Sequence, residues 1–241
     1  MEWTIDSFLI ANFILIVGSI LQMATGVSVG MIIVPFLAMI SYSLIPVPII
    51  FASLILTVMM VIKGREHIDI KSVPQVGFGM LIGIFLSIYV LSNIAFNYLG
   101  YLFGAFILIS VFISVKVKSF TLNYKINYIG GFIAGFMGAM AGVGGQILGL
   151  IFQNHKLESI KSTLAFLYTI FSIVMLFIFY MFDRFSYNDI VSGLYMMPGF
   201  LIGFFISPYF VKYFNPKYAK RTVLITASFG AIILIVKTFL Q

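Results

Sequence analysis

The stretch GFMGAMAGVGGQILGL, residues 135–150, decides how this chain folds. It holds six glycines and no charged residue, and a polar cluster that includes His155 follows it directly. Each glycine in a helix interior costs about 1 kcal/mol relative to alanine, so a plain helix does not explain this composition. We interpret Gly142, Gly144 and Gly145 as a helix break inside a membrane, where bare backbone amides can approach a ligand closely.

A second interpretation of the same stretch stays open. Small residues spaced by four let transmembrane helices pack closely. Gly131 with Gly135, and Gly138 with Gly142, have this spacing. On this interpretation the glycines serve helix packing only.

The composition is that of a polytopic membrane protein. Of the 241 residues, 62% are hydrophobic and 9% are charged, values that a soluble domain of this size would not carry on its surface. The net charge of +7 comes from lysines and arginines in short loops, which indicates membrane topology and argues against nucleic-acid binding. The chain has no cysteine, which excludes disulfides and thiolate metal sites.

The chemistry-bearing motifs of enzymes are missing from the sequence. With two histidines and no cysteine, we expect no metal site and no cofactor. There is no nucleophile motif and no phosphate-binding loop, so we expect neither an enzyme nor ATP-driven transport.

Apolar runs divide the chain into membrane segments. They cover residues 8–40, 49–62, 73–91, 98–115, 126–152, 162–182, 190–211 and 222–240. The runs 8–40 and 126–152 exceed the roughly 20 residues that one span requires, and each contains a glycine-rich weak point. We therefore predict an all-α membrane protein in which each long run folds as two helical pieces.

The two halves of the chain follow one plan. GMLIGIFLS, residues 79–87, is identical to GFLIGFFIS, residues 199–207, at six of nine positions. Gly26 and Gly30 fall opposite Gly142 and the segment 144–146 at a similar offset. We predict a single transmembrane domain over residues 1–241, with one repeat of about residues 1–120 and a second of about 121–241.

Loop charge predicts the orientation. The basic loops 63–71, 116–125 and 212–221 should be cytoplasmic. Each half then has three transmembrane helices after its glycine-broken helical hairpin, and because three is odd, the halves are inverted repeats. The first hairpin should enter from outside and the second from the cytoplasm, with their tips converging near the midplane. If each arm crosses fully instead, the tips separate.

Two glycine-rich segments carry a family resemblance. ATGVSVGMIIVP, residues 24–35, and MAGVGGQILGL, residues 140–150, are each followed by a polar-capped helix beginning near Ser53 or Ser162. This pattern resembles the sulfite exporter TauE/SafE family of membrane permeases over nearly the whole chain. The family usually shows a glycine triplet and then a proline. Here Gln146 takes the third place in the second copy, and the first copy has Ser28 and Val29 before Gly30 but keeps Pro35.

The resemblance implies transport of sulfite, sulfonates or related small sulfur-containing anions, with the two motif regions as binding residues. The breaks themselves also favour an anion, because a helix that restarts presents unpaired amides and about half a positive elementary charge. Hydroxyl and amide side chains supply further donors. The predicted substrate-binding residues are Gln22, Thr25, Gly26, Ser28, Gly30, Ser53, Gly142, Gly144, Gly145, Gln146, Ser162 and Thr163, with Thr57 as a further donor beside Ser53.

Each donor has an alternative role. Serine and threonine in membrane helices often bond their own backbone, and this alternative applies to each hydroxyl above. Gln146 is costly to leave unpaired in hydrocarbon, which favours a ligand role. The cluster of His155, Lys156, Glu158 and Lys161 either attracts an anion or is a charged loop at the membrane interface.

We therefore expect a secondary transporter or facilitator of a small anion, a multi-pass protein in the cell membrane with the lipid bilayer around it. Export is favoured, because each negative charge leaving an inside-negative cell gains about 2.3 kcal/mol per 100 mV. A homo-oligomer is compatible with the sequence. The alternatives are a membrane enzyme with its site at residues 155–161, and a non-transporting partner subunit. Neither explains why the break occurs twice at matching positions.

Overall fold

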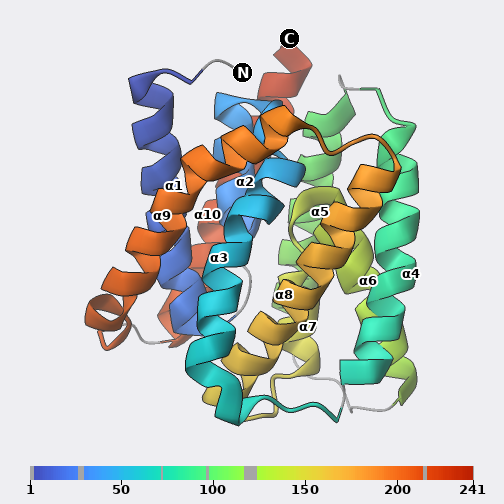
Figure 1. The fold of residues 1–241 in the computed structure, drawn as a ribbon, viewed down its shortest axis with the longest axis vertical. Coiled ribbons are helices and arrows are strands. Elements are labelled where there is room, and N and C mark those ends of the chain that lie inside the picture. Colours follow the sequence, from blue (N-terminus) through green and yellow to red (C-terminus); the bar gives the residue numbers. More distant parts are fainter. Residues whose placement is uncertain are drawn as a thin grey trace.

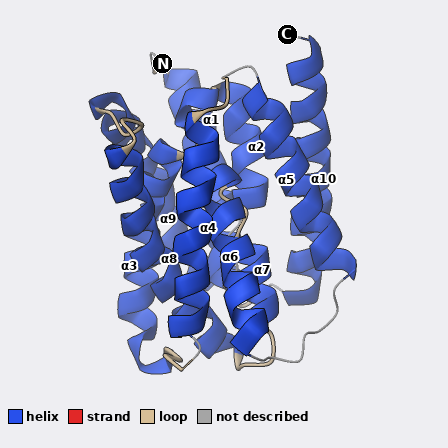
Figure 2. Cartoon of the chain, turned by 90° about the vertical axis from the view of Figure 1, so that its right-hand side faces the viewer, coloured by secondary structure: helices blue, strands red, loops and turns tan. Residues whose placement is uncertain are grey.

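A computed structural model of the chain describes residues 3–26, 30–71, 73–95, 98–116, 124–213 and 216–240, with the backbone alone for 216–220. Every regular element in these residues is helical (Figure 1, Figure 2). The helices are α1 (Ile5–Thr25), α2 (Gly30–Ile40), α3 (Val47–Gly64), α4 (Val73–Ser92), α5 (Leu99–Lys116), α6 (Tyr124–Ala141), α7 (Gly145–Ile151), α8 (Leu157–Met181), α9 (Tyr187–Val211) and α10 (Pro216–Leu240), with short 3-10 helices at Tyr42–Leu44 and Arg65–His67.

Both long apolar runs are broken, as the sequence predicts. The helix α1 ends at a cap formed by Gly26, with φ of 76°, and α6 is followed by Gly142, with φ of 69°. These are left-handed backbone conformations, which glycine adopts without steric cost because it has no Cβ. The prediction of two helical pieces in each long run is therefore confirmed.

Seven of the described helices are long and apolar enough to cross a membrane. Large apolar side chains lie on their outer faces, including Phe13, Phe85, Phe177 and Phe229, each more than half exposed. Lipid rather than water suits such a surface. The all-α multi-pass membrane fold is thus confirmed.

The helix α1 departs from the expected short hairpin arm. It has 21 residues, enough to cross on its own, and its cap at Gly26 touches Lys161 in the second turn of α8. The end of the first arm at Gly26 therefore lies beside α8, and the predicted tip, residues 27–29, lies outside the described residues. At about 1.5 Å per residue α1 extends roughly 31 Å.

One end of the bundle, called here the basic end, is defined by two ion pairs between loops. His155 pairs with Asp69 at 3.0 Å, and His67 pairs with Glu158 at 3.3 Å. At the opposite end, the Arg184 guanidinium donates to the Ser92 carbonyl. Both chain termini lie at the opposite end (Figure 1).

The two hairpins open toward different ends. Tyr42, just after α2, shares a cavity with Arg184 at the opposite end, whereas the segment after α7 reaches Asp69 at the basic end through His155. This placement matches the predicted entry of the hairpins from opposite faces. The inverted repeat itself stays a prediction.

The repeated stretch packs each half onto the other. A Cβ placed on Gly79 or Gly83 of α4 would overlap the carbonyl oxygens of Tyr128 and Phe132 in α6. In the same way, Gly199 and Gly203 bring α9 into close contact with α1 at Asn12 and Ser19. The small-residue motif therefore lies at both interfaces. In each case a helix of one half packs against a helix of the other half, as a two-fold relation between the halves would produce.

The helices after the two hairpins begin earlier than the sequence suggests. The predicted helix starts near Ser53 and Ser162 are wrong by about five residues, because α3 begins at Val47 and α8 begins at Leu157. Pro48 in the first turn of α3 and Glu158 in the first turn of α8 favour these positions. Ser162 and Thr163 consequently lie in the second turn of α8.

Candidate functional site

The two helix breaks touch each other. A Cβ placed on Gly30, the first residue of α2, would overlap the carbonyl oxygen of Gly142 in the second break. Gly142 in turn approaches Val34 of α2. A Cβ on Gly144 would overlap the carbonyl oxygen of Ala134, so the second hairpin closes tightly on α6. Only glycine permits these two approaches.

The same stretch also serves packing. Gly131 and Gly135 lie against the backbone of Val76 and Met80 in α4. The two interpretations of the glycine-rich segment therefore both hold, for different glycines. The packing glycines come first along the chain, and the break begins at Gly142.

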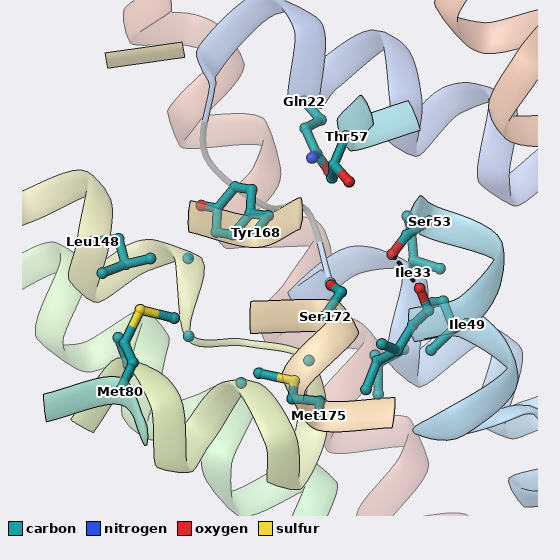
Figure 3. A pocket seen from close by; sticks show the side chains of 18 of the residues that line it. Gln22, Ile33, Ile49, Ser53, Thr57, Met80, Leu148, Tyr168, Ser172 and Met175 are labelled. Carbon is teal, nitrogen blue, oxygen red and sulfur yellow. Dashed lines mark hydrogen bonds between the residues drawn. The ribbon is translucent and has the colours of Figure 1, made fainter. Parts of the chain in front are cut away.

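A cavity of about 100 Å³ lies where the breaks meet, and we call it the central cavity (Figure 3). Its wall comes from α1, α2, α3, α4, α6, α7, α8 and α9. Among the twelve predicted site residues, those that line it are Gln22, Gly30, Ser53, Gly142, Gly144 and Gly145. The rest of the wall is largely apolar, with Ile33, Ile49, Met80, Leu148 and Met175 among its side chains.

Gln22 is the most informative polar group in the wall. Its residue is 6% exposed, and its carboxamide forms no hydrogen bond with any described residue. The carboxamide therefore offers two N–H donors and one oxygen to whatever occupies the central cavity.

The hydroxyl groups of α3 line the cavity but already have acceptors. Ser53 donates to the Ile50 carbonyl at 3.0 Å and Thr57 to the Leu54 carbonyl at 3.1 Å. Each hydroxyl thus gives its proton to its own helix, and its oxygen can still accept a hydrogen bond.

Two polar residues of α8 in the wall, Tyr168 and Ser172, were missed in the sequence. They are four positions apart and so share one helix face. The Ser172 hydroxyl makes no hydrogen bond within the described residues. A usable signal did exist, since a tyrosine in the middle of a span is away from the interfaces where tyrosine is usual.

Four predicted residues lie elsewhere. Thr25 donates to its own helix at the Leu21 carbonyl, and Gly26 packs against Lys161. Ser162 lies against Gly64 at the end of α3. Thr163 accepts from the Asp69 backbone N–H at 2.8 Å and so holds the loop before α4. Ser28 lies outside the described residues.

Gln146 is also buried, yet it does not line the central cavity. Its amide nitrogen lies 3.4 Å from the Met31 sulfur of α2, and its oxygen accepts from Ser114 of α5 at 3.5 Å. The side chain therefore links the second hairpin to the first. The sequence identified it as a polar group needing partners, and protein groups supply those partners.

The helix dipole contributes less than the sequence suggests. The helix α7 has only seven residues, and a dipole summed over so few peptide units is small. The N–H groups of Gly144 and Gly145 nevertheless donate to no acceptor in the part of the chain that the structure describes. These N–H groups, the carboxamide of Gln22 and the hydroxyl of Ser172 can donate hydrogen bonds at the cavity.

The histidines at the basic end join loops. The Nε2 of His155 contacts Asp69, and its Nδ1 lies 3.2 Å from the Phe152 carbonyl. Of the residues described, no group of three or more metal-ligating side chains comes together. One charged side chain lies within a predicted apolar run, Lys237, which donates to the Met39 carbonyl at the end of α2.

Comparison with known proteins gives one match. The family model described as Sulfite exporter TauE/SafE matches residues 10–234, nearly the whole chain. No curated protein and no solved structure matches the chain.

Proposed function

This chain belongs to the sulfite exporter TauE/SafE family of membrane transporters, and from that premise we propose that it moves a small sulfur oxyanion or organosulfonate across the cytoplasmic membrane through the central cavity. The observation that carries this proposal is Gln22. The residue is 6% exposed, lines the central cavity and makes no hydrogen bond with a described residue, so its carboxamide is available to a ligand there.

The chemistry of the wall suits an anion that has shed water. Gln22, Ser172 and the bare N–H groups of Gly144 and Gly145 can all donate. Among the described residues, no lysine, arginine, aspartate or glutamate lines the central cavity. Neutral hydrogen-bond donors bind an anion less tightly than a fixed positive charge would. Transport requires such moderate binding, because the ion must also leave the site.

The size of the cavity supports a small substrate. Its volume of about 100 Å³ is well below the roughly 300–1,000 Å³ of sites that hold drug-sized ligands. Sulfite and the smallest sulfonates are therefore favoured over bulky organosulfonates.

Three cavities follow one another along α8. Lys161 and Ser162 line a cavity of about 270 Å³ at the basic end, Tyr168 and Ser172 line the central cavity, and Phe179 lines a cavity of about 220 Å³ at the opposite end. This order supports a transport route parallel to α8. Phe179 is buried and lines the cavity at the opposite end, not the central cavity.

Export is the proposed direction. The basic end carries most of the loop lysines and is therefore placed in the cytoplasm. A monoanion leaving an inside-negative cell gains about 2.3 kcal/mol per 100 mV without any coupled ion.

Ligand-induced stabilisation of the purified protein tests this proposal. Sulfite, small sulfonates, sulfate and small carboxylates are compared, because a ligand that binds only the folded state stabilises it by about 2.7 kcal/mol at 100 times its Kd. We expect sulfite or a small sulfonate to raise Tm, and Gln22→Leu to lose that rise while keeping the Tm of the ligand-free protein.

Gln153→Leu is the matched control, since Gln153 lies beyond α7 and does not line the central cavity. It should keep the ligand-induced rise. Proteoliposomes loaded with sulfite supply the second measurement. If no sulfur anion raises Tm and none crosses the liposome membrane, the proposed function is wrong.

A further inference from the structure

The cavity at the basic end differs in charge from the central cavity. It has a volume of about 270 Å³ and lies between the ends of α3 and α9 and the start of α8. Its charged lining residues are Lys63, His67, Glu158 and Lys161, with the Ser162 hydroxyl beside them. We call it the basic vestibule.

Positive charge exceeds negative charge in the basic vestibule. The carboxylate of Glu158 is engaged by His67, and both side chains are more than half exposed. Neither Lys63 nor Lys161 forms an ion pair with a carboxylate of the described residues. Lys63 lies 5.6 Å from the centre of the Phe204 ring, a contact that orients its ammonium group without neutralising it.

The vestibule leads directly to the central cavity. On α1, Gln22 lines the central cavity and the next residue, Met23, lines the vestibule. On α3, Thr57 lines the central cavity and Met60, one turn later, lines the vestibule. Met23 and Met60 therefore lie in the vestibule lining beside residues that line the central cavity.

Lys161, unlike Lys63, also contacts Gly26 at the end of α1. A Cβ placed on Gly26 would lie 2.9 Å from the Lys161 Cα and 2.7 Å from its Cγ. Gly26, the cap of α1, thus rests on the backbone and the aliphatic stem of the lysine that lines the vestibule. An ion held by Lys161 lies beside the helix break that bounds the central cavity.

We propose that the basic vestibule is a capture site for small oxyanions, in which Lys63 and Lys161 bind the anion before it enters the central cavity. This inference rests on the proposed function and adds the charge that the central cavity lacks. A cavity lined by one excess sign of charge raises the local concentration of the opposite ion and its rate of entry.

Sulfite transport by oriented proteoliposomes tests the capture site. Lys161→Gln and Lys63→Gln should each raise the half-saturating sulfite concentration from the basic side roughly fivefold, which corresponds to about 1 kcal/mol. The maximal rate and the half-saturation from the opposite side should stay unchanged. Glu158→Gln should lower the half-saturating concentration, since it removes the negative charge.

Lys125→Gln is the control, because Lys125 is exposed at the start of α6, outside the vestibule lining, and carries the same charge. Salt provides a further readout. Raising ionic strength shortens the Debye length from about 8 Å at 0.15 M to about 3 Å at 1 M, so the difference between Lys161→Gln and the unsubstituted protein should shrink. A purely structural lysine would show no such salt dependence.

Equilibrium binding of sulfite to Gln22→Leu separates this inference from the proposed function. With the central donor removed, residual sulfite binding that disappears in Gln22→Leu/Lys161→Gln supports the vestibule even if transport is absent. Transport by the unsubstituted protein, with both lysine variants matching Lys125→Gln, overturns the vestibule and leaves the proposed function standing. Absence of both transport and residual binding overturns both.

Discussion

The carboxamide of Asn12 in α1 is inserted into the backbone of α9 at Gly199, 187 positions along the chain. Its oxygen accepts from the Gly199 N–H at 2.6 Å, and its nitrogen donates to the Tyr195 carbonyl at 3.0 Å. In a regular helix these two backbone groups would bond each other. Pro198 has no N–H and interrupts the helical hydrogen bonds at this point. Asn12 therefore supplies hydrogen-bond partners for both the Gly199 N–H and the Tyr195 carbonyl. In the matching stretch of α4, Phe78 stands in place of Pro198.

Asn12→Leu should therefore destabilise the protein by about 1–3 kcal/mol, because it leaves the buried Gly199 N–H without an acceptor. The Tm of the purified protein in detergent measures this. Asn93→Leu is the matched control, since Asn93 bonds only its own helix at an exposed end. In a Pro198→Ala background the cost of Asn12→Leu should fall, and an equal cost in both backgrounds would refute the link between Asn12 and the proline.

Gly30→Ala should lower stability by more than the about 1–3 kcal/mol typical of overpacking, because the added methyl meets the backbone of Gly142 rather than a flexible side chain. Thermal unfolding measures the loss. Gly138→Ala is the control, since its added Cβ finds its nearest neighbour at 3.5 Å and alanine favours the helix. Equal Tm values for the two variants would show that the breaks do not touch.

Gln146→Leu distinguishes a ligand from a link between hairpins. Its amide contacts Met31 and Ser114 rather than the central cavity. We expect a modest loss of stability, about 1 kcal/mol for a lost hydrogen bond, with the sulfite-induced rise in Tm preserved. Loss of that rise without loss of stability would instead assign Gln146 to the binding site.

Ser172→Ala should weaken ligand binding by about 0.5–1.5 kcal/mol, the usual worth of one hydrogen bond, without unfolding the protein. The hydroxyl faces the central cavity and has no acceptor among the described residues. Titration of Tm with sulfite measures the shift in apparent Kd. Ser228→Ala on α10, where the hydroxyl bonds its own helix at Leu224, should leave that Kd unchanged.

Single cysteines test the orientation of the hairpins, and the absence of native cysteine makes the experiment simple. Ser43→Cys follows the first hairpin and Asn154→Cys follows the second, and both positions are exposed. A membrane-impermeant thiol reagent should label Ser43→Cys from outside and Asn154→Cys from the cytoplasm. Labelling of both from one side would rule out hairpins that open toward opposite faces.

Much of this architecture is local and is therefore visible in the sequence. The glycine-rich breaks in the two long apolar runs are visible in the sequence, because the left-handed conformation at Gly26 and Gly142 disfavours any side chain with a Cβ. The spans follow from the length of apolar runs. The resemblance to the family was likewise visible in the sequence, and the family model matches residues 10–234.

The sequence does not show which of several similar residues packs helices and which forms the break or the site. Gly131 and Gly142 belong to one small-residue pattern, yet the first packs against α4 and the second forms the break. Gln22 and Gln146 are both buried amides, and only Gln22 lines the central cavity. No local rule separates the members of these pairs.

The sequence by itself determined that the chain is a membrane protein with two interrupted helices, because hydrophobic length and glycine conformation act over a few neighbouring residues. Only the tertiary structure decided which polar groups meet in the central cavity. The direction in which a side chain points depends on how its helix is rotated against helices from the other half, and those contacts join residues far apart in the sequence, such as Asn12 and Gly199, which are 187 positions apart.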